Sequence, residues 1–325
     1  MITLINPFNG CALYRSNRGY ADEFGNFFPI VHGHIPFVNE SNYADSFGFQ
    51  WNKFRKTQID RETLTCEQSR ERFFAQTGWD REDLTGKNVL ELGSGAGRFS
   101  QVFLDYTKGN LYSLDYSNAV VANYRNNGHH GEERFRLFRA SVYEMPFPDN
   151  SFDKVFCFGV LQHTPDFRRS IECLVAKAKP GGEIIVDFYP VKGWWTKIHA
   201  KYFFRLFTRR MSYSRLLRLI EKNVDWLMSV NFFIERLGLG RLLNRFLPIC
   251  DIKGTIPSGL TRRQLREWVI LDTFDMFSPE HDHPQRITTV RNWFEKLGMK
   301  VTFAGYVRYG SEGFQSAVVK AVKPV

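Results

Sequence analysis

The most informative stretch of the chain is Val89-Leu90-Glu91-Leu92-Gly93-Ser94-Gly95-Ala96-Gly97-Arg98. A short apolar strand runs into three alternate glycines, and a pattern typical of a helix follows over Gly97 to Tyr106. Glycines allow a tight backbone turn and let a ligand approach the peptide groups closely. The start of the helix adds unpaired N–H groups and a partial positive charge. We therefore predict a ligand-binding loop here rather than a plain strand-to-helix turn.

Two acids near this loop narrow the class of ligand. The glycines follow a Gly-x-Gly-x-Gly pattern, which differs from the Gly-x-Gly-x-x-Gly of dinucleotide-binding folds. Glu91 stands two residues before the first glycine, where a carboxylate suits an amino-bearing or cationic ligand better than a pyrophosphate. Asp115 ends the next strand, 24 residues after Glu91. An acid in that place can accept hydrogen bonds from ribose hydroxyls, although Asp115 could instead cap the helix that follows it.

Strand and helix patterns alternate on both sides of the loop. Such alternation at short spacing is typical of a parallel sheet wrapped by helices. After a break at Pro190, a helix and two strands joined by a Gly-containing turn close the chain. We therefore expect an α/β fold with a doubly wound, Rossmann-like seven-stranded sheet that ends in an antiparallel hairpin strand. The expected strands are 88–92, 110–114, 134–138, 152–158, 183–188, 300–306 and 314–321, and the expected helices are 62–76, 97–106, 118–126, 167–179 and 288–297.

The patterns divide the chain into three parts. Residues 1–60 form a small aromatic extension of short strands and turns. Residues 61–190 and 285–325 make up the α/β core. Residues 191–284 are rich in helix signals, basic and aromatic side chains, and they are predicted to be an insertion after the fifth strand that caps an acceptor site.

The core resembles the class I S-adenosylmethionine-dependent methyltransferases, from about Lys87 to Phe188 and more weakly over the closing strands. The stretch Glu91-x-Gly93-x-Gly95-x-Gly97 is similar to their first motif, and Asp115 is similar to their ribose-binding acid. The turns 147–153 and 179–182 are similar to those that precede their fourth and fifth strands. The resemblance implies an enzyme that uses S-adenosyl-L-methionine as its cofactor.

The resemblance also implies a set of cofactor-binding residues. In that family the loop after the third strand contacts the adenine, often through an Asp, whereas this chain has Ser141 there. The hydroxyl of Ser141 or the backbone of Val142 is expected to take over that contact. In that family the segment before the core can close over the cofactor, so Gln50 and Trp51 are also candidates for the cofactor pocket. The predicted cofactor-binding residues are Glu91, Gly93, Ser94, Gly95, Gly97, Asp115, Tyr116, Ser141, Val142, Gly159, Gln50 and Trp51.

A narrower resemblance concerns the N-terminal extension and the Phe-Ser-Pro-x-His-Asp-His-Pro stretch at 277–284. Both are similar to segments of bacterial methyltransferases that tailor sugars, glycolipids and natural products, and the leader of that subgroup often resembles a small zinc ribbon. Cys11 is the one cysteine in the extension, so no metal site is expected.

His163 is the first candidate for a catalytic base. It follows the fourth strand, and ligands of open α/β sheets lie at the carboxyl ends of the strands. An imidazole titrates near neutral pH and can take the proton of an acceptor hydroxyl. His163 could instead line the cofactor pocket or hydrogen-bond its own loop.

A second group of candidates lies in the polar stretch 272–286, which contains Asp275, His281 and His283. One interpretation is a lid over the acceptor, in which one of these three side chains is a catalytic base. The His-x-His pair could instead bind a metal, or the stretch could be a solvated loop with proline turns.

The charge of the chain is concentrated in one segment. Residues 191–263 contain fifteen Lys or Arg against four Asp or Glu, a net +11, whereas the whole chain carries +10. A basic segment on a near-neutral body indicates an anionic partner. Bulky apolar residues alternate with the arginines, so the segment is predicted to form amphipathic helices. They could lie on an anionic membrane or hold a lipid-linked acceptor, or they could simply cap the sheet. The sequence contains no recognisable motif of a nucleic-acid-binding module, so a nucleic-acid partner is not expected.

Composition excludes several classes of protein. With 43% hydrophobic and 24% charged residues the chain is an ordinary globular one. Five scattered cysteines exclude a disulfide scaffold. No apolar stretch reaches the 18 residues of a membrane span, and the first 30 residues show no signal-peptide pattern. A cytoplasmic location is expected, with peripheral contact with the inner face of a membrane as an option.

The expected function is methyl transfer to a small-molecule or lipid-linked acceptor, with O-methylation of a sugar or glycolipid as the first guess. One alternative is a non-catalytic protein that uses the cofactor fold as a binding scaffold. Another is an NAD-dependent oxidoreductase, which the glycine spacing opposes.

Overall fold

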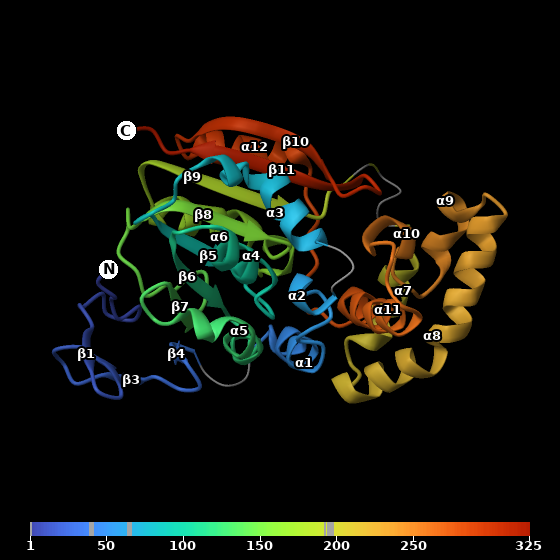
Figure 1. Cartoon of the computed structure of the whole chain (residues 1–325), viewed down its shortest axis with the longest axis horizontal. Helices are drawn as coiled ribbons and strands as arrows, with labels where there is room; N and C mark the ends of the chain where they lie inside the picture. The colour runs from blue at the N-terminus through green and yellow to red at the C-terminus, as the bar shows by residue number, and fades with distance from the viewer. Residues whose placement is uncertain (1, 39–41, 64–66, 192, 194–197) are drawn as a thin grey trace.

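The computed structural model describes residues 2–38, 42–63, 67–191, 193 and 198–325. These residues form one large sheet flanked by helices, a small sheet near the N-terminus, and a group of helices at the opposite end of the molecule (Figure 1). The small sheet consists of β1 (Tyr14–Ser16), β2 (Gly19–Ala21) and β3 (Phe27–Pro29).

The large sheet is mostly parallel, and its closing strand β11 is antiparallel to β9 and to β10. The doubly wound fold predicted from the sequence is confirmed. Over the described residues the sheet contains the seven expected strands and one more, because β4 of the N-terminal extension pairs in parallel with β7 at the edge. In spatial order the strands are β10 (Lys300–Tyr309), β11 (Phe314–Val322), β9 (Ala178–Phe188), β8 (Phe152–Phe158), β5 (Asn88–Leu92), β6 (Asn110–Asp115), β7 (Phe135–Arg139) and β4 (His34–Pro36).

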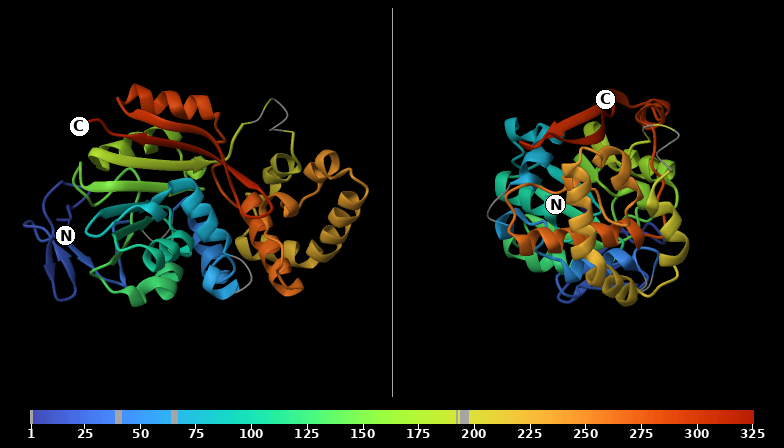
Figure 2. Two further views of the ribbon diagram at one scale, coloured as in Figure 1. Left: turned by 45° about the horizontal axis from the view of Figure 1, so that its top comes forward. Right: turned by 90° about the vertical axis from the view of Figure 1, so that its right-hand side faces the viewer.

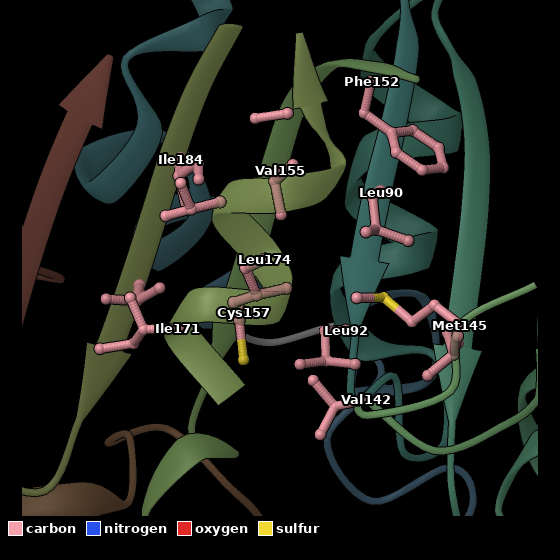
Figure 3. Close-up of a cluster of buried hydrophobic side chains, with 14 of the residues drawn as sticks. Leu90, Leu92, Val142, Met145, Phe152, Val155, Cys157, Ile171, Leu174 and Ile184 are labelled. Atoms are coloured by element: carbon pink, nitrogen blue, oxygen red, sulfur yellow. The ribbon is translucent and has the colours of Figure 1, made fainter. Parts of the chain in front are cut away.

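Alternate side chains of the central strands build two separate hydrophobic cores. Leu90 and Ile184 belong to one core, whereas their neighbours Val89 and Ile185 belong to the other, and all four are fully buried. This follows from the two-residue period of a strand whose two faces are both covered. Figure 3 shows the first core between β5, β8, β9 and the helix that carries Leu174.

Helices cover both faces of the sheet. α3, α4 and α5 pack on one face, and α6 and α12 pack on the other (Figures 1 and 2). Short 3₁₀ turns complete the connections at η1 (Trp79–Arg81), η2 (Gly128–His130) and η3 (Leu161–His163). The helices of this part are α1 (Asp45–Lys53), α2 (Asp60–Thr63), α3 (Gln68–Thr77), α4 (Arg98–Tyr106), α5 (Val120–Asn127), α6 (Phe167–Lys177) and α12 (Ile287–Lys296).

The N-terminal extension fills a gap on the second face of the sheet. Parallel strands are normally joined by a crossover helix, but residues 140–151 between β7 and β8 contain none. Leu4 and Phe37 of the extension lie instead in the core that contains Phe138 and Phe147. The extension therefore supplies apolar cover where a crossover helix would usually lie.

Residues 198–277 form a helical group at one end of the sheet (Figures 1 and 2). It has a hydrophobic core of its own, which includes Leu216, Leu227, Ile270 and Phe274. None of the helices in the described part of the chain is both long and apolar enough to cross a membrane. The helices are α7 (Ala200–Thr208), α8 (Tyr213–Arg236), α9 (Gly240–Leu243), the 3₁₀ turn η5 (Asn244–Phe246), α10 (Ile252–Thr255) and α11 (Arg262–Phe277).

Candidate functional site

The loop between β5 and α4 has little room for side chains. Its three glycines have positive φ angles of 75°, 53° and 84° at Gly93, Gly95 and Gly97, a region that L side chains avoid. A Cβ on Gly93 would lie 2.2 Å from Val160, and a Cβ on Gly95 would lie 3.1 Å from the Trp51 indole nitrogen. The loop thus needs glycine for its backbone conformation and for the close approach of its neighbours.

Asp115 ties the end of β6 to the glycine loop. The Gly95 N–H donates to its Oδ2 at 2.8 Å, and the Ser117 N–H and hydroxyl donate to its Oδ1 at 2.8 and 2.7 Å. Burial raises the pKa of Asp115, although these hydrogen bonds oppose the rise. Asp115 therefore stabilises the turn that follows β6, and it lines a cavity at this edge of the sheet. It does not cap the next helix, because the N-cap of α5 is Ala119 and makes no side-chain hydrogen bond.

The Glu91 side chain points into the layer between the sheet and α4. Its Oε2 accepts hydrogen bonds from the Ser100 hydroxyl and, at 2.7 Å, from the Ser113 hydroxyl. Burial raises its pKa to about 7. Glu91 does not line the cavity, because the pleat directs its side chain to the same face as Val89. Its predicted contact with the cofactor stays a prediction.

One cavity of about 580 Å³ opens at the carboxyl ends of the strands, between the sheet, α1 and the helical group. This is the edge at which ligands of open α/β sheets bind. The predicted site residues that line it are Gln50, Trp51, Gly93, Ser94, Gly95, Asp115, Tyr116, Val142, Gly159, His163 and Asp275. Residues far apart in the sequence therefore meet in one place.

Five predicted site residues do not line the cavity: Glu91, Gly97, Ser141, His281 and His283. Gly97 lies beneath the loop, where a Cβ would come within 2.1 Å of the Asn123 side-chain oxygen. The Ser141 hydroxyl accepts from the Tyr143 N–H at 3.2 Å within its own turn, and the neighbouring Val142 faces the cavity instead.

Helix α1 lies over the glycine loop and carries two predicted residues. Gln50 is fully buried, and its Nε2 donates to Asp275 Oδ1 at 3.1 Å. Its Oε1 has no hydrogen-bond partner among the described residues. Trp51 packs against Gly95. The extension thus brings a rigid wall and an unpaired acceptor oxygen to the cavity.

His163 lies at the cavity wall with a defined tautomer. Its Nδ1 is 3.0 Å from the carbonyl oxygen of His281, and a carbonyl can only accept, so Nδ1 carries the proton. The basic lone pair of the neutral ring is therefore on Nε2. The rings of Phe47 and Tyr189 pack against the imidazole at centroid distances of 5.1 and 5.6 Å.

The backbone of the loop with His281 and His283 supports His163 and its neighbour Gln162. The His283 N–H donates to the Gln162 carbonyl at 2.8 Å, and the imidazoles of His281 and His283 stack on each other with centroids 5.7 Å apart. Asp282, which lies between them, lines the cavity instead. The backbone of this loop positions His163, and the rings of His281 and His283 are not among the described side chains that line the cavity. A catalytic role of these two histidines stays a prediction.

Several side chains of the helical group that were not predicted from the sequence also line the cavity. Lys201 of α7 forms an ion pair with Asp282, with Nζ and Oδ2 2.7 Å apart. Burial alone would raise the pKa of Asp282, but Lys201 holds it below its ordinary value. Arg205 donates to the carbonyls of Met276 and Pro279 at 3.4 and 2.7 Å. The basic composition of this segment was visible, but which of its cations face the cavity depends on tertiary packing.

Asp187 is a further cavity residue that was not predicted from the sequence. It ends β9 and accepts hydrogen bonds from Arg72, Gln76 and the Gly159 N–H at 2.5, 2.8 and 2.5 Å. An acid at the carboxyl end of a predicted strand was the available signal. Asp187 joins α3, β9 and the loop that follows β8 at the cavity wall.

The cavity fits a nucleoside-bearing cofactor. Backbone at Gly93 and Gly95 is accessible there, the Asp115 carboxylate faces it, and the buried Ser94 hydroxyl has no partner among the described residues. Val142 and Tyr116 add apolar and aromatic surface on which a base can lie.

Part of the chain is similar to known methyltransferases. Residues 90–186 match the family described as a methyltransferase domain. Over 113 residues the chain is 31% identical to the tRNA U34 carboxymethyltransferase of Nautilia profundicola, which covers 34% of this chain and 37% of that protein. Over 107 residues it is 28% identical to phosphoethanolamine N-methyltransferase 2 of Caenorhabditis elegans, which covers 32% of this chain and 24% of that protein. The chain thus spans well under half the length of these relatives.

A solved structure extends the likeness in fold beyond the matched residues. This structure is the complex of the Haloferax volcanii Trm112 methyltransferase activator with a methyltransferase. The two chains share 13% sequence identity with a TM-score of 0.50, and the match covers 86% of this chain and 99% of the other.

Proposed function

We propose that this chain, whose residues 90–186 are a class I S-adenosylmethionine-dependent methyltransferase domain, transfers the methyl group of that cofactor to a hydroxyl group. The acceptor is a small or lipid-linked molecule, and sugars and glycolipids are the first class to test. The observation that carries the proposal is the cavity in which the glycine loop, Asp115 and His163 meet polar side chains of the helical group.

The chain's own residues divide into two sets within the cavity. Gly93, Ser94, Gly95 and Asp115 would hold the cofactor, with Trp51 closing over the loop. S-adenosylmethionine supplies an electrophilic methyl group on a sulfonium, so the protein's part is to position the acceptor and remove its proton.

His163 is suited to removing that proton. The His281 carbonyl fixes the proton of the neutral ring on Nδ1, so Nε2 can accept the proton of a hydroxyl. The packed rings of Phe47 and Tyr189 limit rotation of the imidazole. The same arrangement would not be needed for a protein that only binds the cofactor.

A second set of lining residues supports an acceptor with several hydroxyl groups. Asp275, Asp282, Tyr202 and Arg205 line it and offer both donors and acceptors. Helix α7 carries Tyr202 and Arg205 toward the cavity, and the same helix exposes Phe203, Leu206 and Phe207. A helix with one polar cavity face and one exposed apolar face suits an acceptor with a polar head and an apolar tail.

The first experiment is calorimetric titration with S-adenosylhomocysteine, using the intact chain. Saturable one-to-one binding is expected. G95D should abolish it, because a charged side chain would enter the space beside Trp51. G86D is the matched control, because Gly86 also has a positive φ of 74° but no neighbour within 4 Å of its Cβ position.

The second experiment measures release of S-adenosylhomocysteine with panels of sugars, glycolipids and other hydroxylated acceptors. Turnover with a hydroxylated acceptor supports the proposal. Cofactor binding without turnover on any panel favours the scaffold alternative, and equal cofactor affinity of G95D and the wild type contradicts the assignment of the loop.

A further inference from the structure

Helix α8 has two apolar faces, although only one of them packs on the protein. The buried face includes Leu216, Ile220, Val224 and Leu227 within the core of the helical group. A surface helix normally presents polar residues on its other side. This helix presents a second apolar stripe there, which needs a separate explanation.

The exposed stripe follows the period of the helix. Leu219, Trp226 and Phe233 are spaced seven residues apart, and Leu237 lies one turn beyond Phe233, so the four share one face. Their exposed fractions are 48%, 54%, 62% and 56%. Two further exposed residues continue from the end of α8, Leu242 at 67% and Phe246 at 56%. We call these six residues the α8 stripe.

Cations flank the stripe. Lys222 and Arg215 lie within one turn of Leu219, and Arg218 and Arg236 lie at the edge of the same face. Among the described residues none of these four forms an ion pair with a carboxylate.

The acids of α8 are engaged elsewhere. Asp225 pairs with Arg266 of α11 at 3.1 Å, and Glu221 lies 3.8 Å from Lys53 of α1. Glu235 accepts from Asn244 at 2.6 Å and lies 3.5 Å from Lys253. The outer face of α8 is therefore apolar and cationic, with its negative charges paired to other elements.

We propose that the α8 stripe docks the protein on the surface of an anionic lipid bilayer. Exposed Trp, Phe and Leu side chains flanked by Lys and Arg are the features with which an amphipathic helix lies in the headgroup region. A second copy of the chain is a poorer occupant, because it would bring two segments of net +11 together. The docking does not depend on methyl transfer, so it can be tested separately from the proposed function.

The test is co-sedimentation of the intact chain with vesicles of phosphatidylcholine alone or with about one third phosphatidylglycerol. We expect at least about tenfold stronger binding to the anionic vesicles at low salt, because each Lys or Arg near such a surface contributes about 1 kcal/mol. Raising the salt tenfold should remove most of that difference through screening.

Two pairs of variants locate the surface. W226E/F233E should weaken binding at least about tenfold, since both apolar side chains are lost from the bilayer. F24E is its matched control, because Phe24 is 73% exposed but lies in the N-terminal extension at the opposite end of the molecule (Figure 1). K222E/R215E should lose the preference for anionic vesicles, whereas K108E, at an exposed lysine outside the helical group, should keep it.

Unchanged affinity for S-adenosylhomocysteine, or an unchanged urea midpoint, shows that each variant is folded. The proposal is overturned if wild-type binding is equal on neutral and anionic vesicles, or if W226E/F233E binds like F24E. It is also overturned if sedimentation velocity shows a dimer that W226E/F233E abolishes while vesicle binding is absent, because the stripe would then be an interface between copies.

Discussion

Replacing Gly97 by alanine tests the packing beneath the glycine loop. Gly97 has a φ of 84°, and an added Cβ would lie 2.1 Å from Asn123 Oδ1 and 2.3 Å from Asn127 Nδ2. Both asparagines are fully buried. They cannot move without breaking the hydrogen bonds from Asn127 to the Gly97 carbonyl at 3.0 Å and to Asn123 at 2.8 Å.

The expected cost has two parts. An alanine in the left-handed region costs about 1–2 kcal/mol. Loss of two buried hydrogen bonds adds about 0.5–1.5 kcal/mol each. We therefore expect G97A to lower the free energy of unfolding by about 2–5 kcal/mol.

The matched control separates the two parts. Gly86 has a φ of 74° and nothing within 4 Å of its Cβ position, so G86A should show the backbone cost alone. Urea unfolding at neutral pH, followed by far-ultraviolet circular dichroism, measures both variants against the wild type. The reasoning is refuted if G97A and G86A differ by less than about 0.5 kcal/mol. A double-mutant cycle of G97A with N123A should show coupling, because N123A removes Asn123 Oδ1, the nearer of the two atoms that clash.

Three further predictions concern the cavity and the extension. H163A should lower kcat about 100-fold or more while changing the Kd of S-adenosylhomocysteine by less than about threefold, and a wild-type rate would remove His163 as the base. Burial, with repulsion from Asp275, raises the pKa of Asp272 from 3.8 to about 7. Between about pH 4 and pH 7 the native state keeps the Asp272 carboxyl protonated while the unfolded state loses that proton, so the wild type loses stability as the pH rises. The urea midpoint of D272N should therefore exceed that of the wild type by more at pH 8 than at pH 5. A difference that does not depend on pH would contradict this prediction. F37A should cost about 3–5 kcal/mol of stability because Phe37 is 2% exposed in the core, whereas F8A, at a 60% exposed residue of the same extension, should change urea stability by less than about 0.5 kcal/mol.

The strands and the glycine loop could be predicted because their signals are local. The expected strands 88–92 and 152–158 have the observed bounds of β5 and β8. The edge strand β4 could not be predicted as part of the sheet. Its three residues are too few for a periodic signal, and its pairing with β7 joins His34 to Leu137, far along the chain.

For Glu91 the local sequence pattern gave the position at the end of the strand but not the direction of the side chain. Its position before the first glycine indicated a ligand contact, but Val89 on the same strand faces the layer beneath α4. Glu91 shares that face by the period of two, and its neighbour across β6 is Ser113, whose hydroxyl meets its carboxylate. The alternation of side chains along the strand was therefore the signal that Glu91 supports the loop from beneath α4.

For the basic segment, composition predicted the net charge but not which surface each cation faces. A net charge of +11 indicated one anionic partner for residues 191–263. In the folded chain Lys201 pairs with Asp282 at the cavity, and Arg205 donates to two backbone carbonyls. Lys222, on the outer face of α8, has no such partner among the described residues. Cations of one segment therefore serve two surfaces, so charge reversal at Lys222 should affect vesicle binding but not cofactor affinity, whereas K201E should disturb the cavity and leave vesicle binding intact.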